Sequence, residues 1–77
     1  MKAYLSDILR ELGLGGYLEF VWRTGKVRLV TAKGEGLAVD GRSYHAFTGN
    51  DSSYERTEEG QAGEDLTNLV IRWRKRP

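Results

Sequence analysis

Basic side chains are the residues of this sequence whose types and spacing most directly suggest a chemistry. Clustered cations bind phosphate backbones mainly by releasing counterions, and an aromatic ring beside them can stack on an unpaired base. The sequence thus predicts a nucleic-acid-binding surface as one possible function, unless these cations simply form a solvated face and tail. The predicted contacts are Arg23, Lys26, Arg28, Arg72, Arg74 and Lys75, with Tyr17 or Tyr44 as the stacking ring.

Acidic side chains gather in a different segment, residues 48–65, which are polar and contain several glycines. A long charged loop on a small scaffold commonly presents a protein-binding surface; the alternative is a solvated loop without a partner. The predicted protein-binding residues are Asp51, Tyr54, Glu55, Glu58, Glu59 and Glu64. The partner would be an unidentified protein or a second copy of the chain.

The overall charge balance favours the protein partner over nucleic acid. The chain has 12 Lys and Arg against 11 Asp and Glu, a formal net charge of +1, whereas a dedicated nucleic-acid binder of this size is expected to be strongly basic. We therefore expect a non-catalytic module that acts through protein–protein interaction, as accessory, regulatory or inhibitor-like proteins of phages and viruses do. A continuous basic face would instead favour nucleic acid.

Residues of catalytic type are present but do not predict an enzyme. Asp40, Ser43 and His45 supply an orienting group, a nucleophile and a base, and Ser43 and His45 would share one face of a strand. Such a triad also needs a concave site with oxyanion donors, for which a chain of 77 residues leaves little room. We predict no catalytic residue, and His45 is interpreted as an ordinary strand residue.

Cofactor and metal sites are not predicted either. The chain has no cysteine and a single histidine, His45, so the usual ligands of a structural zinc site are lacking. The glycines of residues 13–16 follow a predicted helix, whereas a phosphate-binding loop precedes one.

The elements that must position these side chains are a short helix and several strands in one domain, residues 1–77. Apolar residues at helical spacing predict a helix at residues 4–12 that ends at Gly13. Alternation predicts a hairpin at residues 17–32 with a two-residue turn, Thr24-Gly25. This register pairs Trp22 with Val27, Phe20 with Leu29 and Leu18 with Thr31. It places Leu18, Phe20 and Trp22 in the core, and Arg23, Lys26 and Arg28 on the opposite face.

The second half of the chain is predicted to be a hairpin, a loop and a strand. The hairpin, residues 37–48, turns at Asp40-Gly41 and pairs Leu37 with either Tyr44 or His45. The acidic loop 48–65 and a final strand at 66–74 follow. The fold class is therefore α+β, mainly β, with a short N-terminal helix and about five antiparallel strands. Such short strands favour a small SH3-like or Sm-like barrel, and a flat helix-on-sheet sandwich is the alternative.

The order of elements over residues 8–47 resembles the WYL-domain family. The matching segments are Leu18-Glu19-Phe20, Thr24-Gly25-Lys26-Val27-Arg28 and Gly36-Leu37-Ala38-Val39-Asp40-Gly41-Arg42-Ser43-Tyr44. Of the Trp-Tyr-Leu tripeptide that names the family, only Tyr44 is matched, since Ser43 and His45 flank it. The resemblance implies an Sm-like or SH3-like barrel of the kind found in bacterial regulators that sense nucleic acids or nucleotide-like ligands.

The N-terminal residues and the hydropathy pattern bear on location. Asp7 and Arg10 interrupt any apolar run near the N-terminus, so no signal peptide is predicted. No segment approaches the roughly 20 apolar residues of a membrane span. We expect a cytoplasmic protein without membrane contact.

Overall fold

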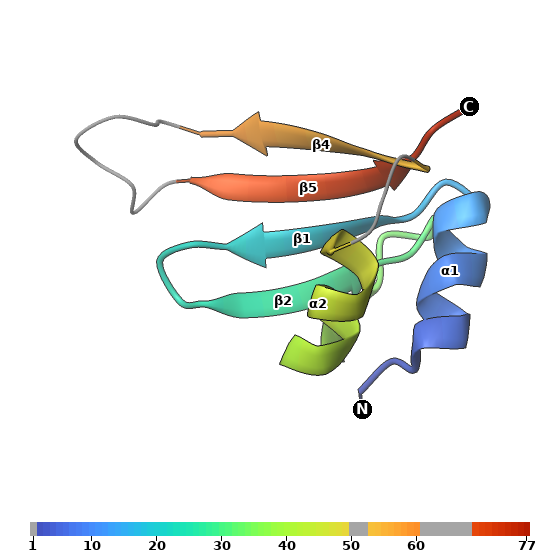
Figure 1. The fold of residues 1–77 in the computed structure, drawn as a ribbon, viewed down its shortest axis with the longest axis horizontal. Coiled ribbons are helices and arrows are strands. Elements are labelled where there is room, and N and C mark those ends of the chain that lie inside the picture. Colours follow the sequence, from blue (N-terminus) through green and yellow to red (C-terminus); the bar gives the residue numbers. More distant parts are fainter. Residues whose placement is uncertain (1, 50–52, 61–68) are drawn as a thin grey trace.

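A computed structural model describes residues 2–49, 53–60 and 69–77 of the chain (Figure 1). Three strands follow the first helix of these residues and two follow the second, and all pairings between the strands are antiparallel. The elements are α1 (Leu5–Gly13), β1 (Tyr17–Val21), β2 (Lys26–Val30), β3 (Gly36–Val39), α2 (Gly41–Thr48), β4 (Tyr54–Glu59) and β5 (Val70–Lys75). The protein is therefore a small α+β domain, as the sequence predicts.

The five strands form one sheet in the order β3-β2-β1-β5-β4. The first and last strands of this order, β3 and β4, are its edges, and no pairing between them closes the described sheet into the predicted barrel. Both helices contribute to one hydrophobic core on the same face of the sheet, and Figure 1 shows α2 in front of the strands. This two-layer arrangement is the helix-on-sheet alternative.

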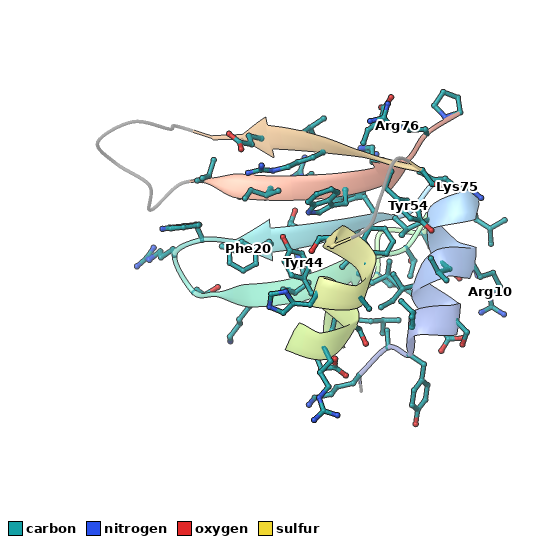
Figure 2. The ribbon with its side chains drawn as sticks, in the orientation of Figure 1. Arg10, Phe20, Tyr44, Tyr54, Lys75 and Arg76 are labelled. Carbon is teal, nitrogen blue, oxygen red and sulfur yellow. The ribbon has the colours of Figure 1, made fainter. Side chains whose placement is uncertain are left out.

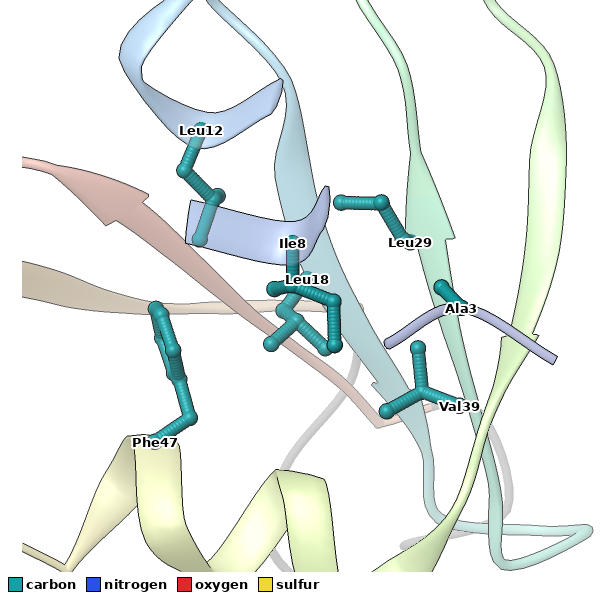
Figure 3. Close-up of a cluster of buried hydrophobic side chains, with 7 residues drawn as sticks. All are labelled: Ala3, Ile8, Leu12, Leu18, Leu29, Val39 and Phe47. Atoms are coloured by element: carbon teal, nitrogen blue, oxygen red, sulfur yellow. The ribbon is translucent and has the colours of Figure 1, made fainter. Parts of the chain in front are cut away.

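The core lies between the helices and that face of the sheet (Figure 3). Ile8 of α1, Leu18 of β1 and Leu29 of β2 are its fully buried side chains, and Leu12 and Phe47 extend it along the two helices. Each such side chain contributes about 1.5–3 kcal/mol on transfer from water. With no cysteine in the sequence, this cluster is a main source of the fold's stability.

Helix α1 includes Gly13, and the left-handed residue that terminates it lies two positions later than predicted. Gly13 is still helical, and the positive φ of 96° belongs to Gly15. The amide of Gly15 donates to the carbonyl of Leu12 (3.3 Å), and the amide of Gly16 donates to that of Glu11 (2.8 Å). This pair of bonds is a Schellman motif, which terminates a helix through a left-handed residue.

The predicted hairpin at residues 17–32 is confirmed, but its register differs by two residues. Leu18 faces Leu29 and Phe20 faces Val27 across a four-residue turn, so neither predicted partner is kept. A shift of two preserves the face of every side chain, and Leu18 is buried as expected. Trp22, however, falls in the turn with an exposed fraction of 49%, so its prediction as a core residue was wrong.

The predicted hairpin at residues 37–48 is wrong beyond its first strand. After β3, Asp40 caps a helix: its Oδ1 accepts a hydrogen bond of 2.7 Å from the amide of Ser43. Asp-Gly is a turn signal before a strand and an equally good helix start before a helical segment. Tyr44 and Phe47 then lie three residues apart on one side of α2 and reach the core.

The prediction of a loop over residues 48–65 is wrong for residues 54–59, which form β4 against β5. Charged side chains are tolerated there because β4 is an edge strand, exposed along most of its length. The final strand is confirmed as Val70–Lys75; residues 66–68 of its predicted range lie outside the described part of the chain. None of the described helices is long and apolar enough to cross a membrane.

Candidate functional site

The sheet face opposite the helices carries most of the predicted basic residues, and we call it the open face. Residues paired across antiparallel strands point to the same side of a sheet, so the pairings assign its members. They are Tyr17, Glu19, Val21, Lys26, Arg28, Val30, Gly36, Ala38, Glu55, Thr57, Glu59, Val70, Arg72 and Arg74. The last strand lies beside the first hairpin, since β5 pairs with β1, and this pairing brings the basic residues of both onto one face.

Glu19 lies at the centre of the open face with an exposed fraction of only 3%. Its Oε1 accepts a hydrogen bond of 2.7 Å from Nε of Arg28, and its Oε2 accepts one of 3.1 Å from Nε of Arg72. The two arginines flank it from β2 and β5, so one row crosses three strands. A buried carboxylate requires such partners, because burial without them would be costly.

Tyr17 supports the arginines of β5 in the adjacent row. The Cζ atom of Arg74 lies 4.5 Å from the centre of the Tyr17 ring, and that of Arg72 lies 5.0 Å from it. Both distances are within the range of cation–π attraction. Tyr17 therefore contacts two guanidinium groups, and its role as a ring that stacks on a base stays a prediction.

Arg72 is the most extensively paired cation of the open face. Besides its bond to Glu19, its Nη1 donates to Glu59 of the neighbouring strand β4. Partial burial alone would lower the pKa of Arg72, but the hydrogen bond to Glu19 and the charges of Tyr17 and Glu59 outweigh it, so the pKa is raised. Arg72 is therefore a fixed positive charge of the sheet.

Arg28 and Arg74 keep hydrogen-bonding capacity that the described residues do not use. Arg28 donates through Nε alone, and its side chain is 56% exposed. Arg74 stacks on Tyr17 without a hydrogen bond to any described residue. A guanidinium group has five N–H donors in a fixed fork. The open face thus presents two oriented forks that suit carboxylate or phosphate oxygens.

Three other predicted nucleic-acid contacts lie elsewhere. Lys75 alternates to the side of the sheet that carries the helices (Figure 2), and Arg23 is in the β1–β2 turn. Tyr44 is on α2, where its ring stacks on Phe20 at 5.5 Å and its hydroxyl accepts a hydrogen bond from Trp73. Tyr44 is therefore a packing residue on the opposite side of the sheet from the arginines.

The predicted protein-binding residues of β4 are divided between the two sides of the strand. Glu55 and Glu59 join the open face, opposite Arg74 and Val70, while Tyr54 and Glu58 point to the side of the helices. Glu58 pairs with Arg56 of its own strand. Asp51 and Glu64 lie outside the described residues.

The residues of catalytic type lie in α2 and at its N-terminal cap, and the helix turns their side chains away from one another. Ser43 and His45 are two positions apart on a helix, so they point in different directions rather than sharing a face. The hydrogen bond from the Ser43 amide lowers the pKa of the Asp40 carboxyl, as expected for a helix cap. The described residues form no cavity and no group of three potential metal ligands.

Glu19 is the site residue that the sequence analysis missed. It lies on the same face of the first hairpin as Arg28, and nothing in the sequence pattern predicted its burial. Its alternation with Leu18 and Phe20 places it on the polar face, but the place of β1 in the middle of the sheet is known only from the strand order. The pairing of β1 with β5 supplies the second cation that Glu19 meets, Arg72.

Comparisons with known proteins give no relative to guide the assignment. No protein-family model, curated protein or solved structure matches this chain. The resemblance of residues 8–47 to WYL domains therefore stays a prediction, and the function must be argued from the open face itself.

Proposed function

We propose that this protein is a non-catalytic binding module that recognises another protein through the open face. The observation that carries the proposal is the row Arg28–Glu19–Arg72, which fixes the arginines in orientation on an uncovered side of the described sheet. The oriented forks of Arg28 and Arg74 suit a partner surface or segment that carries carboxylates. An accessory or regulatory role in the cytoplasm is part of this proposal.

The kinds of residue on the open face support a protein partner. Arginine and tyrosine are among the residues that dominate binding energy at protein interfaces. Ordering a long side chain on association costs about 0.5–1.5 kcal/mol. The stacking of Arg74 on Tyr17 and the bond between Arg28 and Glu19 reduce this cost, because both side chains are already held before the partner arrives.

The charge pattern of the open face also favours a protein over nucleic acid. Its cations are interrupted by carboxylates: Glu19 between Arg28 and Arg72, and Glu55 and Glu59 on the next strand. A phosphate backbone favours an unbroken run of cations. An alternating pattern suits a protein surface, on which both signs of charge occur.

Nucleic-acid binding is the second candidate, supported by the gathering of Lys26, Arg28, Arg72 and Arg74 on one face. In this case single-stranded oligonucleotides would bind with a strong salt dependence. The open face would then be the same surface with a different ligand.

The test is selection from a random peptide library displayed on phage, using the immobilised protein. We expect the enriched peptides to carry aspartate or glutamate. A chosen peptide should bind Arg28→Ala and Arg74→Ala at least about fivefold more weakly, the loss of one charge-assisted hydrogen bond. Arg10→Ala is the matched control, since Arg10 lies on α1, away from the open face (Figure 2).

Fluorescence anisotropy with a labelled single-stranded oligonucleotide at two salt concentrations separates the two candidates. Tight binding that collapses with salt and requires Arg74 would assign the open face to nucleic acid. Enrichment of peptides without acidic residues, or equal losses in Arg74→Ala and Arg10→Ala, would contradict the carboxylate-bearing partner.

A further inference from the structure

Strand β4 is the outer strand at one end of the described sheet, and its register shows which of its backbone groups face outward. The amide of Arg76 donates to the carbonyl of Ser53 (2.8 Å), so these two residues form a hydrogen-bonded pair. Such pairs recur at every second position of an antiparallel ladder. Glu55, Thr57 and Glu59 therefore bond to β5, while Arg56 and Glu58 direct their N–H and C=O groups away from the sheet.

The opposite edge of the sheet is already occupied in part. The segment before α1 runs beside β3, where the amide of Ala3 donates to the carbonyl of Ala38 (2.8 Å) and Lys2 forms a parallel bridge with the same residue. Gly36 and Ala38 are the positions of β3 whose backbone faces outward, and the segment before α1 occupies Ala38. Of the two edges, β4 is thus the one at which the described residues leave room for an added strand.

The charge of β4 indicates which kind of strand would add to it. Its side chains include Glu55, Glu58 and Glu59 against the single cation Arg56. Side chains directly opposite each other on neighbouring strands lie about 4.5–5.5 Å apart, so an incoming strand would meet mostly carboxylates. Glu58 and Glu59 already pair with Arg56 and Arg72, so a lysine or arginine of that strand would chiefly complement Glu55 on the open face.

A second copy of the chain fits this edge poorly. In a two-fold pairing of β4 with itself, the outward-facing residues must meet each other. Setting Arg56 opposite Glu58 also sets Glu55 opposite Glu59, and setting Arg56 opposite its own copy brings two cations together. Like charges directly opposite each other destabilise a strand pair.

We propose that the edge of β4 binds an extended, lysine- or arginine-containing segment of another protein by strand addition. Main-chain hydrogen bonds to Arg56 and Glu58 supply the affinity, and the glutamates of β4 select a cationic segment. The inference names a second contact surface for the proposed protein-binding function. It uses residues other than Arg28 and Arg74, so the two can fail separately.

The experiment uses the full chain and a synthetic peptide of alternating lysine and valine. Amide exchange is followed by NMR with and without the peptide. We expect slower exchange at Arg56 and Glu58 in the complex, because these amides gain acceptors. A glutamate–valine peptide of equal length should bind much more weakly, and the Arg10→Ala variant, changed on α1 away from β4, should bind the cationic peptide as the wild type does.

Two substitutions at Arg56 separate strand addition from simple charge attraction. Arg56→Ala removes a cation that repels the peptide, so binding should tighten slightly. Arg56→Pro removes the same cation together with the outward N–H, and binding should weaken by about fivefold or more relative to Arg56→Ala, the loss of one hydrogen bond. Proline is tolerated on an edge strand when its nitrogen faces outward, and circular dichroism checks that Arg56→Pro is folded.

Opposite shifts for Arg56→Ala and Arg56→Pro, with slowed exchange at Arg56 and Glu58, would support strand addition. Equal affinity of the two variants, no binding of the cationic peptide, or equal binding of the acidic one would overturn it. Protection of the same amides at high protein concentration without peptide would also overturn it, because the occupant would then be a second copy.

Discussion

Arg72 and Glu19 lie directly opposite each other in β5 and β1, and Nε of Arg72 donates a hydrogen bond of 3.1 Å to Oε2 of Glu19. The two residues come from opposite ends of the chain, so this contact forms only when the last strand has joined the sheet. Arg28 of β2 donates a hydrogen bond to the other oxygen of the same carboxylate, so Glu19 links three strands on the open face. The bond therefore serves both the fold and the proposed binding surface.

Replacing Glu19 by glutamine should destabilise the protein by about 1–2 kcal/mol, because two charge-assisted hydrogen bonds become weaker or are lost. The shape of the side chain is kept, so the loss reports on charge and hydrogen bonding. Denaturant unfolding measures the change. Glu35→Gln, the same substitution at an exposed turn residue, should cost less than about 0.5 kcal/mol. Equal costs at the two positions would show that the Glu19 row adds nothing to stability.

Of the three glycines at the end of α1, Gly13, Gly15 and Gly16, the last should be the least tolerant of a side chain. A Cβ atom there would lie 2.8 Å from the carbonyl oxygens of both Glu11 and Val30, so the backbone would have to move. We expect Gly16→Ala to destabilise by about 2–3 kcal/mol, and Gly15→Ala by about 1 kcal/mol through its positive φ of 96°.

Gly13→Ala is the matched control, since a Cβ atom at this helical position meets nothing within 4 Å. It should be neutral or stabilising by up to about 1 kcal/mol, because alanine favours the helix. Thermal unfolding of the three variants gives the order. A cost at Gly13 as large as that at Gly16 would contradict the described end of α1.

The sequence predicts the parts of this fold that depend on local periodicity. Helix α1 and the first hairpin follow from apolar spacing, and the faces of β1 and β2 survive a two-residue error in register, because the side-chain period of a strand is two. The same alternation placed Arg28 on the polar side. Arg72, which shares the Glu19 carboxylate with Arg28, is placed there only by the pairing of β5 with β1.

The missed elements depend on tertiary contacts. Tyr44 and Phe47 fit either a strand or a helix in a segment this short. Helix α2 forms because both rings pack against aromatic side chains of the sheet, Tyr44 against Phe20 and Phe47 against Trp73. β4 has few apolar residues and becomes a strand through β5, which supplies its backbone partners. Edge strands of this kind carry almost no periodic signal.

Acidification should weaken the cap of α2. The pKa of Asp40 is lowered below its ordinary value of 3.8, chiefly by the hydrogen bond from the Ser43 amide. The stabilisation is therefore fully present above that value and is lost as the pH falls through the lower pKa of the folded state. Asp40→Asn keeps an acceptor that does not titrate, and Asp40→Ala removes the acceptor.

Thermal unfolding from neutral pH to about pH 2 distinguishes these variants. The difference in melting temperature between wild type and Asp40→Ala should shrink at the acid end, because the protonated carboxyl no longer caps the helix as well. Asp40→Asn should show less dependence on pH than the wild type in the same range. A constant difference between wild type and Asp40→Ala would mean that the cap does not depend on the charge.

The packing of α2 on the sheet should depend on Tyr44 in two separable ways. Its hydroxyl accepts a hydrogen bond of 3.2 Å from Nε1 of Trp73, and its ring stacks on Phe20. Tyr44→Phe removes only the hydrogen bond and should cost about 1 kcal/mol. Tyr44→Ala removes the ring as well and should cost about 3 kcal/mol, as for other large-to-small changes in a packed cluster.

Trp73 fluorescence reports directly on this contact in a Trp22→Phe background, since Trp73 is then the only tryptophan. In Tyr44→Phe the emission maximum should shift only slightly, because the indole loses one hydrogen bond but stays covered by the ring. In Tyr44→Ala it should shift to longer wavelength, because water reaches the indole where the ring was. If Tyr44→Ala left both the stability and the emission unchanged, α2 would not be held by this pair. Its position would then have to rest on Phe47, which packs against Tyr54 at 4.1 Å between ring centres.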